Sequence, residues 1–294
     1  MTMRRTIDLT AGLIAYEDTG GDGPAIVLLP GLLMDSSLYD GVVASLAPGH
    51  RCITPTLPLG AHLHPMNADA DLSPHGQARL VAELLERLDL DDVTLVGNDT
   101  GGALVQLVVT APQLAAAAAR VGRIVLVSCD AFDNFPPGLT GKMVVLTGKL
   151  PPALFGLFFQ PMRIKAMRRM PIAFGWLTKH GDAATKRWLA PVLSGGAIRR
   201  DTVRVLREIG ASRTILVEAA DRLPAFERPA LVVWATEDRV MPPEHGRRLA
   251  ALLPDARLVE LDDTYTLIPL DQPATLADAI RSFVDAPSPA PVTR

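Results

Sequence analysis

The sequence of 294 residues has little cysteine, few aromatic residues and no long apolar run. Its two cysteines, Cys52 and Cys129, stand far apart, so neither a disulfide framework nor a CxxC metal site is indicated. Aromatic residues make up only 5% of the chain, so apolar burial must come mainly from aliphatic side chains. The N-terminal segment has no apolar stretch typical of a secretory signal, and no run is long enough to span a bilayer. We therefore expect a cytoplasmic protein.

A large net charge is also lacking. The 29 basic and 32 acidic residues give a formal charge of −3, which offers no reason to expect a nucleic acid or a membrane as a partner. The hydrophobic share of 48% and the charged share of 21% are ordinary for a globular enzyme. We expect a small-molecule substrate, no cofactor and no metal. The oligomeric state stays open, with a homodimer among the possibilities.

Short β-branched runs alternate with longer helical patterns, which predicts an α/β fold with a mostly parallel central sheet and helices on both faces. Strands are expected at 4–9, 13–17, 25–29, 51–55, 93–97, 124–128, 231–235 and 257–261, the first two as an antiparallel hairpin. Helices are expected at 74–88, 100–109, 115–119 and 275–284.

The strand signal disappears between Asp130 and about Pro229, where helical patterns are broken by proline and glycine. We predict a core made of residues 1–130 and 228–285 and a helical cap made of residues 131–227. The cap would cover the carboxyl edge of the sheet, where open α/β sheets bind ligands. The Pro-rich tail, residues 286–294, is expected to be disordered.

The strongest local signal is the sequence VGNDTGG, which contains Asp99 between an expected strand and an expected helix. A side chain on such a tight strand-to-helix turn requires small neighbours two residues before and after it, and Gly97 and Gly101 meet that need. The helix N-terminus also favours negative charge there. An aspartate that only caps the helix is the alternative, but the complete pattern favours Asp99 as a nucleophile.

Over residues 4–284 the chain resembles the α/β-hydrolase superfamily, and its elbow resembles the aspartate-nucleophile branch of haloalkane dehalogenases and epoxide hydrolases. The segment LLPGL resembles the loop that supplies half of an oxyanion hole. The resemblance implies that the backbone N–H groups of Leu32 and Thr100 form this hole. It also places the acid of the catalytic triad at Asp238, with Asp130 at the alternative position of that acid.

The histidine of the triad is missing. Members of the superfamily end with a pattern like D-x-G-H-(x)6-P, and alignment on Pro273 places Thr266 at the histidine position, with Tyr265 beside it. An aspartate nucleophile forms an ester, which water activated by the histidine then hydrolyses. Threonine is too weakly basic for this task, and loss of a general base costs roughly 10²–10⁴ in rate.

Other groups are candidates for the site. His62 and His64 follow the carboxyl end of a strand, and Asn98 lies within the elbow. Trp176 is a source of an indole N–H for a halide, and Tyr265 is a candidate acid or hydrogen-bond donor. The resemblance is incomplete in either branch, because no tryptophan follows the nucleophile and the expected cap contains no tyrosine.

Three functions are consistent with these residues. In the first, Asp99 is the nucleophile of a hydrolase acting on a neutral, hydrophobic ester, halide or epoxide in an apolar pocket under the cap. In the second, a non-hydrolytic enzyme (a cyclase, isomerase, lyase or transferase) uses Asp99 and Tyr265 as acid and base. In the third, the protein binds a small molecule without converting it.

Overall fold

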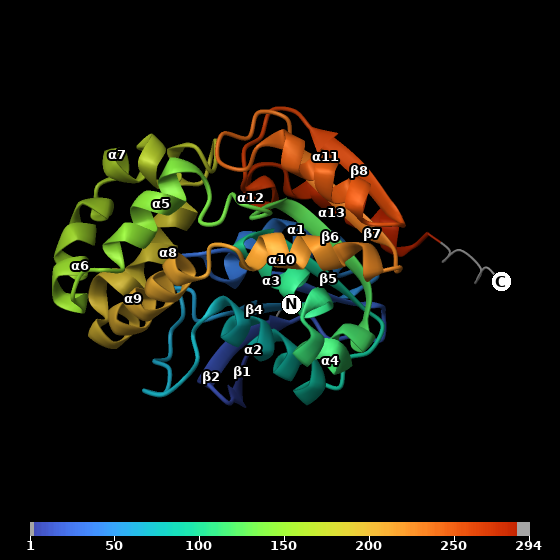
Figure 1. Cartoon of the computed structure of the whole chain (residues 1–294), viewed down its shortest axis with the longest axis horizontal. Helices are drawn as coiled ribbons and strands as arrows, with labels where there is room; N and C mark the ends of the chain where they lie inside the picture. The colour runs from blue at the N-terminus through green and yellow to red at the C-terminus, as the bar shows by residue number, and fades with distance from the viewer. Residues whose placement is uncertain (1–2, 287–294) are drawn as a thin grey trace.

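The computed structural model describes residues 3–286 and contains one eight-stranded sheet (Figure 1). Its strands are β1 (Met3–Leu9), β2 (Gly12–Asp18), β3 (Ala25–Leu29), β4 (Arg51–Thr56), β5 (Val93–Asp99), β6 (Val121–Cys129), β7 (Ala230–Ala235) and β8 (Ala256–Leu261). The spatial order is β1-β2-β4-β3-β5-β6-β7-β8. The β1–β2 and β2–β4 pairings are antiparallel and the others parallel, so the predicted α/β fold class is confirmed. Beyond residue 286 the predicted tail lies outside the described residues.

Helices cover both faces of the sheet. They are α1 (Asp40–Leu46), α2 (Pro74–Arg87), α3 (Thr100–Thr110), α4 (Ala115–Arg120), α5 (Gly138–Thr147), α6 (Pro152–Phe159), α7 (Lys165–Arg168), α8 (Asp182–Ser194), α9 (Gly196–Ala211), α10 (Ile215–Arg222), α11 (Pro243–Leu252), α12 (Ile268–Asp271) and α13 (Pro273–Val284). Short helical turns include η3 (Gln160–Arg163) and η4 (Pro171–Gly175). Within the described chain no helix alone is long and apolar enough to cross a bilayer; α3 and Pro112–Arg120 meet that criterion only jointly, across an 83° bend.

Local sequence explains where these elements begin and end. Helix α2 starts after Ser73, whose hydroxyl accepts the Gly76 N–H, and proline occupies its first position. Its last turn carries Arg87, which suits the negative end of the helix dipole. Strand β5 is buried along its whole length, as expected of a central parallel strand covered on both faces.

Between β6 and β7 the described chain forms helices and helical turns, joined by irregular segments, and no strand. Figure 1 shows α5 to α9 gathered in a group to one side of the sheet. Helix α10 packs against α3 instead, so this lateral group ends before α10. We call α5 to α9, with the turns between them, the helical insertion.

Six neighbouring strands run parallel, in the order β4-β3-β5-β6-β7-β8. Their carboxyl ends therefore meet at one edge of the sheet. The residues that follow these ends include Leu32, Asp130, Asp238 and Thr266, while Asp99 is the last residue of β5. The fold thus gathers these five residues, all predicted for catalysis or the oxyanion hole, at the edge where α/β sheets bind ligands.

Candidate active site

The turn between β5 and α3 holds Asp99 in a backbone conformation that side chains rarely adopt, with φ 55° and ψ −129°. The residues two positions before and after Asp99 must be glycine for steric reasons. A Cβ on Gly97 would lie 2.4 Å from the Gly101 carbonyl, and a Cβ on Gly101 would lie 2.0 Å from the Leu29 oxygen. A strained turn kept in place by such close packing is typical of a functional residue.

The Asp99 carboxylate sits in the predicted oxyanion hole. Its Oδ1 accepts the backbone N–H of Thr100 at 2.7 Å and that of Leu32 at 3.2 Å. Gly31 makes this approach possible, because a Cβ there would lie 2.3 Å from Oδ1. The two N–H groups therefore lie where the sequence predicts them, but they bind Asp99 itself.

Asp99 and Thr100 form part of the wall of a cavity of about 150 Å³. The rest of the wall is mainly apolar and includes Leu32, Met34, Phe135, Phe158, Phe159, Phe174, Leu189 and Val240. The hydroxyls of Thr140 and Thr147 also reach the wall but donate to backbone carbonyls. Within the described chain, Asp99 is the one ionisable side chain in this wall. An apolar cavity of similar size in another protein binds benzene, so the space suits a small, neutral, apolar molecule.

The individual phenylalanines of this wall were not predicted. The sequence signal for them was only the abundance of Phe, Leu and Met between β6 and β7. Which of these side chains face the cavity depends on how the helices of the insertion pack together. That packing cannot be predicted from the spacing of residues within one helix.

Asp130 lies outside the cavity wall. It is fully buried, its Oδ2 accepts the Thr100 hydroxyl at 3.0 Å, and its Oδ1 is buried without a hydrogen bond. Burial, and then the neighbouring charge of Asp99, hold the Asp130 pKa well above its usual range. Burial also raises the pKa of Asp99, although the hydrogen bonds from Thr100 and Leu32 oppose that change.

Asp238 and Thr266 form a direct pair. The Thr266 hydroxyl donates to Asp238 Oδ1 at 2.8 Å, and the same oxygen accepts the N–H groups of Val240 at 2.9 Å and Met241 at 2.8 Å. Burial raises the pKa of Asp238 to about 6 despite these bonds. Thr266 is therefore hydrogen-bonded to Asp238, at the position where the resemblance would place a histidine.

Asn98 lies inside the protein and not in the cavity wall. Its Nδ2 donates to the carbonyl oxygens of Val127 at 2.9 Å, Ser128 at 3.2 Å and Thr266 at 2.7 Å. These bonds tie the elbow to β6 and to the loop that carries Thr266. The pocket position expected for Asn98 is therefore wrong, because its amide is used to join backbone segments.

The two candidate histidines also lie away from the cavity. His62 is buried, accepts the Gly60 N–H at Nδ1, and lies with Nε2 3.6 Å from Asp201 Oδ2 on α9. His64 is partly exposed. Neither lines the cavity, so the expected pocket position is wrong for both. The buried Asp201 carboxylate, which the sequence did not reveal as a partner, is what His62 faces.

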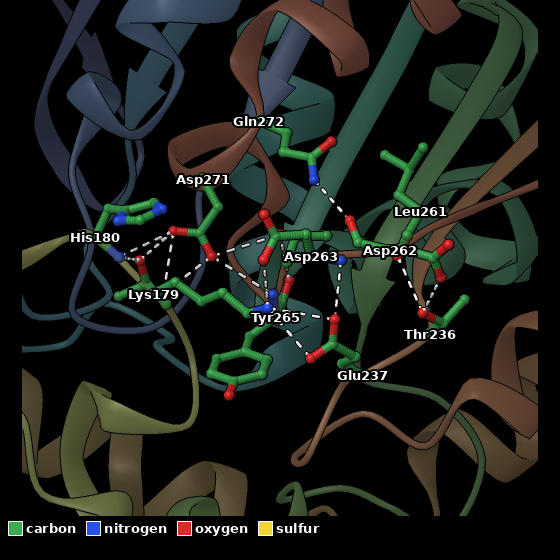
Figure 2. A network of polar contacts seen from close by, with 12 residues as sticks. Lys179, His180, Thr236, Glu237, Leu261, Asp262, Asp263, Tyr265, Asp271 and Gln272 are labelled. Carbon is green, nitrogen blue, oxygen red and sulfur yellow. Dashed lines mark hydrogen bonds and ion pairs between the residues drawn. The ribbon is translucent and has the colours of Figure 1, made fainter.

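Tyr265 and Trp176 are not part of the cavity wall either. The half-buried Tyr265 ring has two cations near it, with Lys179 Nζ 5.0 Å and the Arg239 guanidinium 5.1 Å from its centroid. Figure 2 shows the ring beside the Lys179 side chain. Trp176 packs half-buried against the hydrophobic core. The expectation that Tyr265 presents its hydroxyl to the cavity is therefore wrong, because its ring packs near Lys179 and Arg239 and not in the cavity wall.

A polar network joins the helical insertion to the Thr266 loop (Figure 2). Lys179 Nζ lies 3.2 Å from Glu237 and 2.8 Å from Asp263, and Asp271 accepts the Thr178 hydroxyl at 2.5 Å and the Lys179 N–H at 3.0 Å. These contacts hold the segment between η4 and α8 of the insertion against the loops that follow β7 and β8.

Comparison with known proteins gives a consistent result. A model described as the alpha/beta hydrolase family matches residues 26–279. Haloalkane dehalogenase 2 of Mycobacterium tuberculosis is 28% identical over 281 residues, which cover 94% of this chain and 93% of that protein. The 2-hydroxy-6-oxononadienedioate/2-hydroxy-6-oxononatrienedioate hydrolase of Cupriavidus pinatubonensis is 27% identical over 252 residues, covering 83% and 81%. The crystal structure of the haloalkane dehalogenase DbeA-M1 loop variant from Bradyrhizobium elkanii has the same fold, with a TM-score of 0.75, 18% identity and 96% of each chain covered.

Proposed function

We propose, since this chain belongs to the alpha/beta hydrolase family, that Asp99 is a nucleophile that forms an ester with a small, neutral, apolar alkyl compound. One observation carries the proposal. The Asp99 carboxylate is fixed through Oδ1 by two backbone N–H groups and forms part of the wall of a cavity that is otherwise lined mainly by apolar side chains. An apolar wall selects a neutral molecule, and the fixed carboxylate is positioned to attack it.

The occupied oxyanion hole favours an alkyl substrate over an acyl one. Hydrolysis of an acyl compound requires N–H donors for the oxygen of the substrate carbonyl. Here both N–H groups bind Asp99 Oδ1. Attack on a saturated carbon needs no such hole, and we assign Oδ2 as the attacking oxygen because Oδ1 is already engaged.

The leaving group must depart without a proton. Opening of an epoxide requires an acid that protonates the oxygen, and the described cavity wall offers only Asp99 and threonine hydroxyls among its polar side chains. A halide leaves as a stable anion with the bonding electron pair, while Oδ2 forms the new bond to carbon. The similarity to Haloalkane dehalogenase 2 supports this choice of leaving group.

The second step is slow in this proposal. Water must attack the ester, and Thr266 stands against Asp238 where a base is needed. We further propose that the helical insertion acts as the cap of the site, since Phe158, Phe159 and Phe174 of its helices and turns line the cavity. The acid–base alternative with Tyr265 loses its support because that side chain is outside the cavity wall.

Intact-protein mass spectrometry after incubation with 1-iodobutane tests the proposal. We expect wild type to gain one butyl group and the isosteric Asp99→Asn variant to gain none above background. Asparagine keeps an acceptor for the two N–H groups but is a far weaker nucleophile, so this control separates chemistry from folding. Equal labelling of both proteins, or none in either across a series of small alkyl iodides and bromides, would refute the role of Asp99.

A further inference from the structure

The helical insertion carries most of the large hydrophobic side chains that are exposed in the described part of the molecule. Of the thirteen large hydrophobic side chains that are exposed among the described residues, nine lie within residues 139–172. Exposed hydrophobic residues scattered singly are normal, but a gathering of them marks an interaction surface.

Two helices of the insertion turn an apolar stripe outward. On α5 the exposed large apolar residues are Leu139, Met143 and Leu146, spaced four and three residues apart, so they lie on one side of the helix. On α6, Leu154 and Phe158 show the same spacing, with Leu157 beside them. In a globular protein such a stripe normally packs against the core, so here it is left for a partner.

Some of the exposed apolar side chains of the insertion also line the cavity. Met143 on α5, Phe158 on α6 and Ile172 in η4 are 41%, 57% and 41% exposed, and all three also line the cavity that contains Asp99. Side chains that reach both the cavity and the surface lie at its rim. The exposed apolar surface is therefore continuous with the wall of the cavity.

The charge of the same segment is strongly positive. Residues 134–181 contain seven of the chain's lysines and arginines and no aspartate or glutamate. Five of these cations are exposed, and each is one to three residues from an exposed apolar side chain: Lys142, Lys149, Arg163, Lys165 and Arg169. Long cationic side chains in such positions cover apolar surface with their stems and extend their charge outward.

We propose that this face, made of the exposed apolar and cationic side chains of residues 139–172, binds the surface of a membrane that contains anionic lipids. Apolar stripes buried in the outer acyl region, with cations at the level of the headgroups, are the arrangement of proteins that lie on a bilayer. Residues 139–172 contain no acidic residue, and among their exposed cations Lys165 has one nearby, Asp182 at 3.8 Å. This excess of positive charge favours an anionic lipid surface over a protein interface, in which charges of both signs would be expected. The rim of the cavity would then face the acyl chains, a source of apolar molecules.

Flotation with large unilamellar vesicles tests the proposal without any chemistry at Asp99. We expect wild type to bind vesicles of phosphatidylcholine with 30% phosphatidylglycerol, to bind pure phosphatidylcholine at least tenfold less, and to dissociate as the salt concentration rises. The double variant Lys142→Glu/Lys149→Glu should lose at least tenfold in affinity for the anionic vesicles.

A matched pair of variants locates the surface. Leu157→Glu changes a side chain of the face that is 69% exposed, and Leu63→Glu changes one outside it that is 50% exposed. We expect the first to bind anionic vesicles at least tenfold more weakly and the second to bind as wild type, with equal melting temperatures. Absence of vesicle binding, or equal binding of both variants, would overturn the proposal. So would a wild-type dimer that Leu157→Glu converts to a monomer while vesicle binding is absent, because that result would make the face a protein interface.

Discussion

Two buried carboxylates at the carboxyl edge of the sheet are held in much the same way and face different surroundings. Asp99 Oδ1 accepts two backbone N–H groups, and so does Asp238 Oδ1. Asp99 faces an apolar cavity, whereas Asp238 faces the hydroxyl of Thr266. Under the proposed function, Asp99 therefore has the surroundings that a nucleophile needs, while Asp238 has a threonine hydroxyl as its partner and no proton acceptor.

The largest effect is expected from a substitution that places a base at position 266. We expect Thr266→His to speed hydrolysis of the Asp99 ester by roughly 10²–10⁴, the usual contribution of a general base. Asp238 Oδ1 would then orient the imidazole in place of the threonine hydroxyl. Single-turnover measurements of alcohol release from the butyl ester check this expectation.

Thr266→Asn is the control for side-chain size in that experiment. Asparagine fills similar space and accepts hydrogen bonds but is not a base. Equal rates of alcohol release from the histidine and asparagine variants would show that the position of residue 266 does not give a base access to the ester.

The charge of Asp238 offers a second test, through stability. Its pKa of about 6 in the folded chain lies above the ordinary 3.8, so its contribution to stability is present below pH 3.8 and is lost as the pH rises through 6. At about 1.4 kcal/mol per pKa unit, we expect the free energy of unfolding of Asp238→Asn relative to wild type to rise by roughly 3 kcal/mol between pH 4 and pH 8. Urea unfolding at a series of pH values measures this; a difference independent of pH would contradict it.

A smaller effect is expected from substitution of Asp130. Asn at position 130 can still accept the Thr100 hydroxyl that Asp130 accepts now. Asp130→Asn should therefore change the rate of Asp99 alkylation by less than about tenfold, well below the cost of losing a general base. A larger loss, measured by the rate of adduct formation, would make Asp130 a participant in the chemistry.

The smallest effect is expected at Tyr265. Its ring lies near Lys179 and Arg239 and outside the cavity wall, so Tyr265→Phe should alter alkylation by less than about twofold and stability by about 0.5 kcal/mol or less. A tenfold loss in alkylation with unchanged melting temperature would return Tyr265 to the site.

The strand-to-helix turn at Asp99 could be predicted from the sequence because it requires residues without a side chain at two fixed positions. Glycine at 97 and 101 is required by contacts that a Cβ would violate, and such requirements are visible in a single chain. The position of Thr266 could also be predicted, since its spacing from Pro273 is set along one short segment. The parallel direction of most strands could be predicted from the alternation of strands and helices.

Side chains placed by long-range packing could not be predicted. His62 turns toward Asp201, more than a hundred residues away, and Tyr265 turns toward Lys179 of the insertion. Local charge is also hidden by the net charge. The net value of −3 averages the acidic remainder of the chain with residues 134–181, which hold seven cations and no acid, so it does not describe the charge of the segment on which the membrane proposal rests.

The most direct test of the account is the fate of the alkyl group on wild-type protein. The protein would be labelled with 1-iodobutane, freed of reagent by gel filtration, incubated for several hours and digested for peptide mass spectrometry. The account predicts a butyl group that remains on the peptide containing Asp99. Loss of that group within minutes with release of butanol, or a butyl group found only on other peptides, would contradict it.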